Sequence, residues 1–258
     1  MDSELPTLFK PGRSWLHDRY PLTKLTFAGC LVVAGFAAPG LSAWLLLGAL
    51  TLPLAASARL ARPLLRALLW TLTPLTAALL IVHGLFNPAN RTVLAAWGGI
   101  ALGQEGLSYA LTVLGRLANA LGGSLLFLYT THPGRLMTAL QQRGLPPGLT
   151  YLIISTLQLL PLMRRRARQI WAAQQARGLR TQGGLPTRLR ALLPMVAPLV
   201  LGALLDTEER ALALEGRGFS MPGRRTSLLA EQDTAIDQQL RLAFLVGTAL
   251  IVIVGWLR

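Results

Sequence analysis

Long apolar runs with almost no ionisable side chains constrain the fold of this chain more than any other feature. Only 14% of the residues are charged, whereas 52% are hydrophobic. Because a helix crosses the hydrocarbon core of a bilayer with about 20 apolar residues, runs of this kind predict an integral membrane protein rather than a soluble one. The runs closest to spanning length are Leu25–Ala38, Leu41–Ala56, Ala67–Phe86 and Leu240–Leu257.

Basic residues lie unevenly between these runs. The chain has a net charge of +14, and almost all of its cationic side chains are arginines. They cluster after the second apolar run, at residues 135–143 and most densely over residues 164–190. Since Lys and Arg are enriched in cytoplasmic loops, this pattern predicts that the N-terminus and residues 132–225 are cytoplasmic. A further span over residues 107–131 brings the expected number to about five.

Two apolar stretches in the middle of the chain are too short to cross the membrane. Leu149–Met163 and Ala191–Leu205 hold about 15 residues each, and Pro194 and Pro198 interrupt the second. We therefore expect an all-α membrane bundle that carries a cytoplasmic arm of long helices. The expected domains are an N-terminal membrane domain of four spans (1–131), the arm (132–225), and a linker with the last span (226–258).

The helices expected in the arm are amphipathic. In the second of them, Leu201, Leu204 and Leu205 fall on one face, which predicts that this face packs on the first helix or on the bundle. Asp206 lies one turn before Arg210, a spacing that predicts an ion pair between them.

Both arm helices end in an arginine followed by a glycine. The first is predicted to stop at Ala176-Arg177-Gly178 and the second at Gly216-Arg217-Gly218, because glycine readily adopts the left-handed conformation that closes a helix. A single arginine at such a position merely complements the helix dipole. Two of them in one cytoplasmic arm indicate a pair of guanidinium groups presented to a partner.

Few side chains are available for chemistry within this chain. The sequence lacks a Gly-x-x-x-x-Gly-Lys-Ser/Thr phosphate-binding loop, and Lys10 and Lys24 are its only lysines. Between Asp18 and Asp206 the only acidic residue is Glu105, so the bundle lacks the paired carboxylates of acid–base catalysis. These patterns predict a chain that is not an enzyme and that binds no cofactor or metal.

Four stretches resemble one family of membrane proteins. They are Gln174–Gly178, Ala213–Phe219, Tyr20–Leu25 and Thr130–Pro133. The first two resemble the paired Ala-Arg-Gly motifs of the transmembrane T component of energy-coupling factor transporters. The other two resemble the opening of that family and the lead into its coupling helices. Gly216 stands where the family usually has alanine.

The resemblance implies a scaffold in a prokaryotic inner membrane. Two crossed coupling helices, arranged as an L-shaped arm, would press Arg177 and Arg217 into two ATP-binding-cassette ATPases, A and A′, which bind ATP and magnesium. The bundle would hold a small substrate-binding S component, whose tilting would admit a vitamin or a cobalt or nickel ion. The residues that would allow close approach to the ATPases are Ala176, Gly178, Gly216 and Gly218.

Three other functions fit parts of the sequence. The permease subunit of a conventional cassette importer would span the membrane, but it would normally present one coupling helix rather than two with arginine at their ends. An intramembrane enzyme would need a cluster of His, Glu or Asp. A basic membrane factor would bind RNA or the ribosome through Arg164–Arg190. The paired motifs favour the T component, with membrane lipid but no nucleic acid among its partners.

Overall fold

The chain is divided into two helical units in the computed structural model, which describes residues 8–38, 40, 42–85, 92–97, 100–179, 184–221 and 231–257. The larger unit holds the described residues of 8–145 and 230–258, and the smaller unit holds those of 146–229. The expected boundary between residues 225 and 226 lies outside the described residues.

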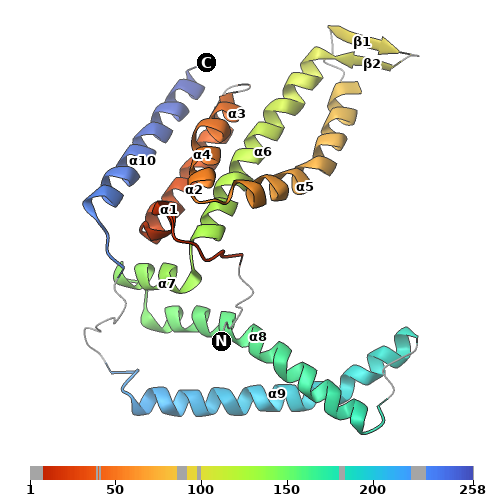
Figure 1. Cartoon of the computed structure of the whole chain (residues 1–258), viewed down its shortest axis with the longest axis vertical. Helices are drawn as coiled ribbons and strands as arrows, with labels where there is room; N and C mark the ends of the chain where they lie inside the picture. Colours follow the sequence, from red (N-terminus) through yellow and green to blue (C-terminus); the bar gives the residue numbers. More distant parts are fainter. Residues whose placement is uncertain are drawn as a thin grey trace. The chain divides into compact units, whose positions relative to one another are not determined.

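A helical bundle forms the larger unit (Figure 1). Its elements are α1 (Trp15–Asp18), α2 (Pro21–Ala37), α3 (Ser42–Leu46), the π-helix η1 (Leu47–Thr51), α4 (Leu52–Ser57), α5 (Ala61–Leu79), the π-helix η2 (Leu80–Leu85), β1 (Val93–Trp97), β2 (Ile100–Gly103), α6 (Gln104–Thr130), α7 (Pro133–Gln142) and α10 (Ala235–Trp256).

Three helical segments of this unit are long and apolar enough to cross a membrane. They are Ala61–Gly84, Gln104–Thr130 and Ala235–Trp256. Pro21–Ala37 and Ser42–Ser57 are apolar but shorter. The predicted all-α membrane bundle is confirmed, and each of the five apolar segments is helical, although only three of them reach spanning length among the described residues.

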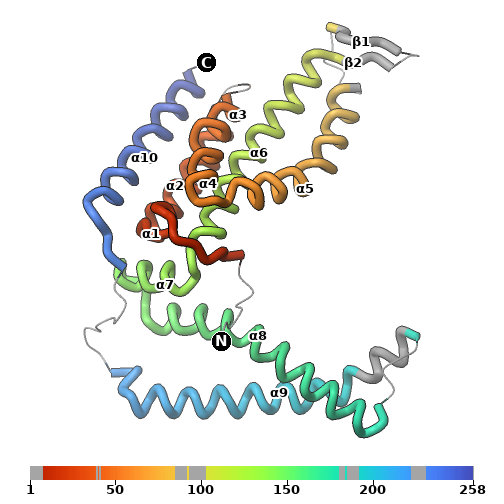
Figure 2. Tube along the Cα trace, viewed as in Figure 1, coloured from red at the N-terminus to blue at the C-terminus, as the bar shows by residue number. Residues whose placement is uncertain are grey.

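Helix α2 lies at the centre of the bundle, against both α6 and α10. Leu31 on α2 and Leu126 on α6 are buried in the same hydrophobic core, and the rings of Phe27 and Phe244 join α2 to α10 with their centroids 5.0 Å apart. Helices near the two ends of the chain therefore pack together, as the trace in Figure 2 also shows.

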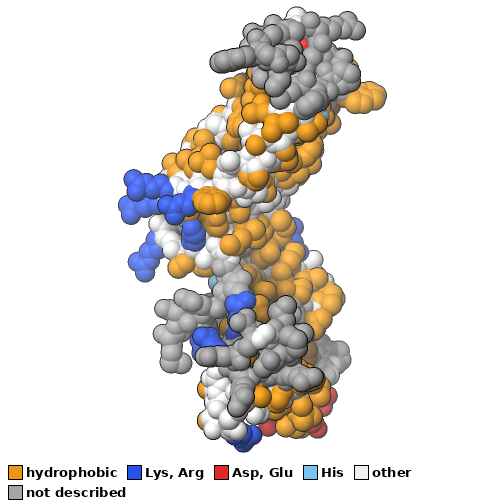
Figure 3. All heavy atoms as spheres, turned by 90° about the vertical axis from the view of Figure 1, so that its right-hand side faces the viewer, with side chains coloured by type: hydrophobic (Ala, Val, Ile, Leu, Met, Phe, Trp, Pro, Cys, Tyr) orange, Lys and Arg blue, Asp and Glu red, His pale blue; other side chains and the backbone are white. Residues whose placement is uncertain are grey.

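Much of the outer surface of the bundle is apolar. Trp70 on α5 is 79% exposed and Leu242 on α10 is 65% exposed. In Figure 3, hydrophobic side chains cover much of the described surface in the upper part of the view. Exposure of this kind would be unfavourable in water and is expected for helices that face lipid.

A short antiparallel ribbon of β1 and β2 connects η2 to α6, and it was not predicted. The strands pair Trp97 with Ile100 and Ala96 with Ala101. The dipeptide Gly98-Gly99 between two apolar runs is a hairpin signal in the sequence, so this ribbon was open to prediction.

Helix α7 belongs to the larger unit, although the expected domain boundary at residue 132 assigned it to the arm. The guanidinium of Arg135 donates to both carboxylate oxygens of Glu231, with Nη2 2.7 Å from Oε2. Arg143 pairs with Asp233, just before α10, at 2.6 Å. These bonds to the segment before α10 explain why α7 groups with the bundle.

The smaller unit consists of α8 (Pro147–Ala176) and α9 (Leu185–Gly216), which cross (Figure 1). At the crossing, Arg166 Nη2 lies 2.6 Å from Asp206 Oδ2, and Arg166 Nη1 donates to the carbonyl of Gly202 at 3.3 Å. The predicted pair of Asp206 with Arg210 is therefore wrong, because Asp206 faces the other helix.

Two further expectations for α9 need correction. Its helix continues through Pro194 and Pro198 instead of being interrupted by them. The predicted packing face is also not buried against α8: Leu201, Leu204 and Leu205 are 60%, 61% and 61% accessible. Contact with α8 is made instead beside Gly202, whose carbonyl accepts a hydrogen bond from Arg166.

Candidate functional site

The first predicted motif forms the end of α8. Ala176 is the last helical residue, Arg177 is the C-cap, and Gly178 has a φ of +88°. The amide of Gly178 donates to Gln175 at 2.9 Å and that of Leu179 donates to Gln174 at 3.0 Å. This pair of bonds is a Schellman motif, in which backbone groups alone close the helix.

The second motif closes α9 in the same way. Gly216 is the last helical residue, Arg217 is the C-cap, and Gly218 has a φ of +73°. The amides of Gly218 and Phe219 donate to Glu215 and Leu214, each at 2.9 Å. Both predicted helix ends are confirmed, including the left-handed glycine that follows each arginine.

A third arginine–glycine end, which the sequence reasoning missed, closes α7. Arg143 is the C-cap and Gly144 has a φ of +100°. Gly144 and Leu145 donate to Gln141 and Leu140, each at 3.1 Å. The letters Arg-Gly-Leu, shared by residues 143–145 and 177–179, were the signal that would have identified it.

The three arginines differ in their partners. Arg143 is bonded to Asp233, which also accepts two hydrogen bonds from Arg241 at 2.7 and 2.6 Å. Arg177 and Arg217 are exposed, and within the part of the chain that the structure describes neither has an ion-pair partner. The same helix ending therefore places one arginine beside an acidic residue of this chain and leaves two arginines exposed at the surface.

The pKa of Asp233 shows how an arginine at such a helix end affects a neighbouring carboxylate. Burial alone would raise the pKa of Asp233, but hydrogen bonds from Arg241 and Arg143 outweigh it and hold the pKa below its usual value. The charged carboxylate is thus the stabilised form, and a carboxylate brought to Arg177 or Arg217 would be stabilised in the same sense.

Surroundings of the motif glycines are open. A methyl group added at Gly178 or Gly216 would meet no atom within 4 Å, whereas one at Gly218 would lie 3.1 Å from Met221 Sδ. Gly216 is helical and not left-handed, so neither its backbone conformation nor packing against the described residues requires a glycine there. The space beside it is accessible to another molecule.

The arrangement of the two exposed ends follows from the crossing of α8 and α9. Phe219, just after the end of α9, packs against Tyr151 in the first turns of α8, with ring centroids 5.6 Å apart. Arg217 therefore lies near the beginning of α8, whereas Arg177 lies at its end, and Figure 1 shows the two helix ends on opposite sides of the crossing. The unit can contact two partner sites at once.

Two polar side chains within the bundle that could act as ligands or functional groups have structural contacts. Among the described residues, no three or more His, Cys, Asp and Glu side chains are grouped so that they could hold a metal ion. His83 stacks on Tyr109 with ring centroids 4.9 Å apart. Asn119 is buried and donates to the carbonyl of Ala43, and to that of Gly115 at 2.9 Å. These contacts give the His83 ring and the Asn119 amide nitrogen structural roles within the bundle.

Comparisons with known proteins identify relatives over most of the chain. Residues 12–228 match the family described as cobalt transport protein, CbiQ. The energy-coupling factor transporter transmembrane protein EcfT of Brevibacillus brevis is 30% identical over 261 residues, which cover 97% of this chain and 96% of that protein. Proteins of the same name from Exiguobacterium sibiricum and Limosilactobacillus fermentum are 29% and 31% identical, over 90% and 84% of this chain and 91% and 85% of theirs.

Proposed function

This chain belongs to the family of the cobalt transport protein CbiQ and the energy-coupling factor transmembrane protein EcfT, and on that premise we propose that its arm couples two ATPases to a substrate-binding membrane protein. It is a multi-pass membrane component of such a transporter, of a kind named for transport rather than catalysis.

The observation that supports coupling is a pair of arginines, at the ends of crossed helices, that have no ion-pair partner among the described residues. Arg177 and Arg217 are exposed, whereas Arg143 at an otherwise similar helix end is held by Asp233. A charge-assisted hydrogen bond to an acidic or carbonyl group of a partner would contribute about 1.5–3 kcal/mol at each end. Two ends on opposite sides of the crossing match two ATPase subunits, A and A′.

Motion would pass from one end to the other through the crossing. The ion pair of Arg166 with Asp206 and the ring contact of Tyr151 with Phe219 hold α8 and α9 together at two places. Closure of the ATPase dimer would therefore displace the arm as a unit rather than bend one helix alone. ATP and magnesium would be bound by the ATPases, and this chain would supply the mechanical connection.

The exposed apolar surfaces suit a second partner within the membrane. A small S component that carries the substrate would pack on the bundle and on the outward leucines of α9, Leu201, Leu204 and Leu205. Its cargo would be a vitamin or a cobalt or nickel ion, according to the S component present. The larger unit, which includes α7 and α10, would then hold the S component, and the unit of α8 and α9 would act as the coupler.

A charge-reversal experiment tests the role of the two arginines. The double variant Arg177→Glu, Arg217→Glu should still insert into the membrane, since backbone bonds close both helices without these side chains. It should lose ATP-driven uptake and co-purify with less ATPase, because each contact changes from attraction to repulsion. Uptake in cells and ATPase recovery after affinity purification measure the two effects.

Arg165→Glu is the matched control. Arg165 is an exposed arginine of α8 outside both motifs, and its reversal changes the charge of the arm without touching either end. Uptake should be retained in this variant. If the double variant transported normally, or if the control lost activity to the same degree, the assignment of coupling to Arg177 and Arg217 would be wrong.

A further inference from the structure

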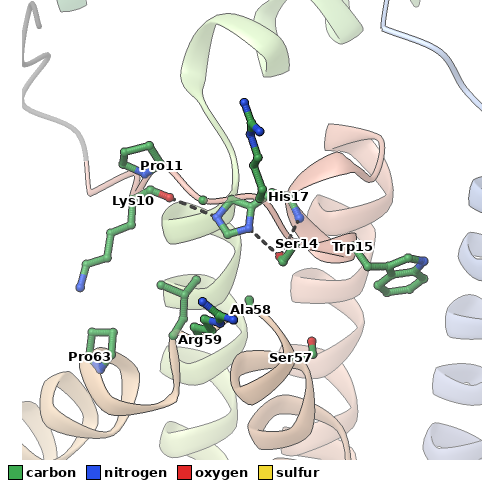
Figure 4. A pocket seen from close by; sticks show the side chains of 12 residues that line it. Lys10, Pro11, Ser14, Trp15, His17, Ser57, Ala58, Arg59 and Pro63 are labelled. Carbon is green, nitrogen blue, oxygen red and sulfur yellow. Dashed lines mark hydrogen bonds between the residues drawn. The ribbon is translucent and has the colours of Figure 1, made fainter.

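A cationic cavity lies between the N-terminal segment and the turn from α4 to α5. It has a volume of about 650 Å³, and none of its lining residues is acidic. Lys10, Arg13 and Arg59 line it together with the hydroxyls of Ser14 and Ser57. Figure 4 shows Lys10 and Arg59 on the same side of His17, one from each wall.

The wall formed by the N-terminal segment is held in place by a buried histidine. His17 is only 4% exposed; its Nδ1 lies 2.7 Å from Ser14 Oγ, and its Nε2 lies 3.1 Å from the carbonyl of Lys10. The amide of Lys10 also donates to Tyr129 of α6 at 3.0 Å. The cavity is therefore a formed site and not a gap beside a loose segment.

Arg59 occupies a backbone position at which glycine would be expected. The amides of Arg59 and Leu60 donate to Ala56 at 2.9 Å and Ala55 at 2.7 Å, which gives α4 the same Schellman ending as α7, α8 and α9. The other three helices have glycine at this left-handed position, whereas α4 has arginine at φ +58°. Among the described residues Arg59 is the only non-glycine residue with a positive φ. A strained arginine facing a cavity suggests that its side chain has a function there.

A second cavity, on the other part of α4, is largely apolar. It measures about 310 Å³, and its apolar lining includes Phe27, Leu50, Leu54 and Phe244. Two cations also line it, but both have partners within the chain: Arg19 pairs with Asp237 at 3.9 Å, and Lys24 Nζ donates to the carbonyls of His17 and Thr130. Trp15 lines both cavities, and α4 contributes Leu54 to the apolar one and Ser57, almost one turn later, to the cationic one. A cationic space and an apolar space beside one helix of a membrane protein fit the two parts of an amphiphile.

We propose that these cavities bind one anionic phospholipid, with its phosphate between Lys10 and Arg59 and an acyl chain against the apolar cavity. Neither cation has an ion-pair partner among the described residues, so a phosphate diester would supply the missing negative charge. The site needs only the membrane location of the bundle, and it is independent of the coupling role of Arg177 and Arg217.

The test uses Arg59→Gly in the full chain, purified in detergent and studied by native mass spectrometry with dioleoylphosphatidylglycerol. Glycine relieves the backbone strain at this position, so the melting temperature should be unchanged or higher. The affinity for phosphatidylglycerol should fall about tenfold, since a charged hydrogen bond is lost. A binding defect in a variant that folds at least as well as the parent cannot be attributed to misfolding.

Controls separate the lipid from other anions. Arg62→Gln removes an exposed arginine outside both cavities and should leave binding unchanged. Dioleoylphosphatidylcholine, which has the same acyl chains and no net charge, should bind about tenfold more weakly than phosphatidylglycerol to the parent protein. Equal binding of the two lipids, or full binding by Arg59→Gly, would overturn the proposal. Displacement of the lipid by millimolar inorganic phosphate would show a site for free anions instead.

Discussion

At the scale of single residues, the same pair of backbone hydrogen bonds ends four of the described helices. The side chains at these four helix ends differ. Schellman bonds close α4, α7, α8 and α9, and the residue in the left-handed position is glycine in three of them. What differs is the environment of the arginine. Arg143 is a C-cap paired with an acid, and Arg177 and Arg217 are exposed C-caps. Arg59 is also exposed, but it occupies the left-handed position itself and lines a cavity.

Gly216 and Gly218 provide a matched pair of substitutions at this scale. Gly216→Ala should stabilise the end of α9 by about 0.5–1 kcal/mol and keep transport, because the position is helical and its Cβ would meet no neighbour. Gly218→Ala should have the opposite effect, since φ is +73° and Met221 is close. Hydrogen exchange of the amides in the last turns of α9 should become slower in the first variant and faster in the second. Equal exchange in both would contradict the assigned helix end.

At the scale of elements, the crossing of α8 and α9 rests on few contacts. Arg166 and Asp206 form its ion pair, with 31% and 24% of their side chains exposed. Partial exposure limits the strength of such a pair, and its main effect is on the geometry of the crossing.

A double-mutant cycle measures this contact. Arg166→Gln and Asp206→Asn should each lower the stability of the protein, and the double variant should show a coupling energy of about 1 kcal/mol. Asp206→Asn combined with Arg210→Gln should give no coupling, because Asp206 faces α8 and not Arg210. Unfolding of the purified chain in detergent reports both cycles, and coupling only in the second would restore the pair expected from spacing.

The sequence predicts a feature well when neighbouring residues in the chain determine it. It predicts a feature poorly when residues far apart in the chain determine it. Apolar runs and arginine–glycine pairs are local, so they located the helices and the ends at Arg177 and Arg217. The partner of Asp206 lies 40 residues earlier, and nothing in the spacing within α9 distinguishes Arg166 from Arg210. The left-handed conformation of Arg59 was not predicted, because no sequence pattern indicates an arginine in this conformation. The role of the motif glycines in close approach to a partner stays a prediction.

At the scale of the whole molecule, the larger unit is joined by contacts between distant segments. The segment before α10 bonds to α7 through Glu231 and Asp233, and Asp237 at the start of α10 accepts from the amide of Tyr20, next to α2. His132 connects α6 to α7: its Nδ1 accepts from the amide of Gly134 at 3.0 Å and caps α7. Burial, and then the charge of Arg135, lower the pKa of His132 below 6.5.

This lowered pKa predicts how the stability of the unit depends on pH. As the pH falls below 6.5, the unfolded chain binds a proton at His132 before the folded chain does, so the free energy of unfolding decreases. Protonation also removes the acceptor that caps α7. The variant His132→Asn keeps a capping oxygen without titrating. Its melting temperature should therefore fall less than that of the parent between neutral and mildly acidic pH, and identical curves would rule out His132 as the titrating group.

Closure of the arm helices by their own backbone has a consequence for how the transporter can change. Since backbone hydrogen bonds close both arm helices, Arg177 and Arg217 can each be replaced without loss of the helix end that carries them. Arg143 has no such freedom, because its replacement would leave Asp233 with one counter-ion fewer. Among relatives, replacement of the residue at 143 should accordingly be accompanied by replacement of its acidic partner. If the proposed coupling holds, the residues at 177 and 217 should instead vary with the ATPase subunits.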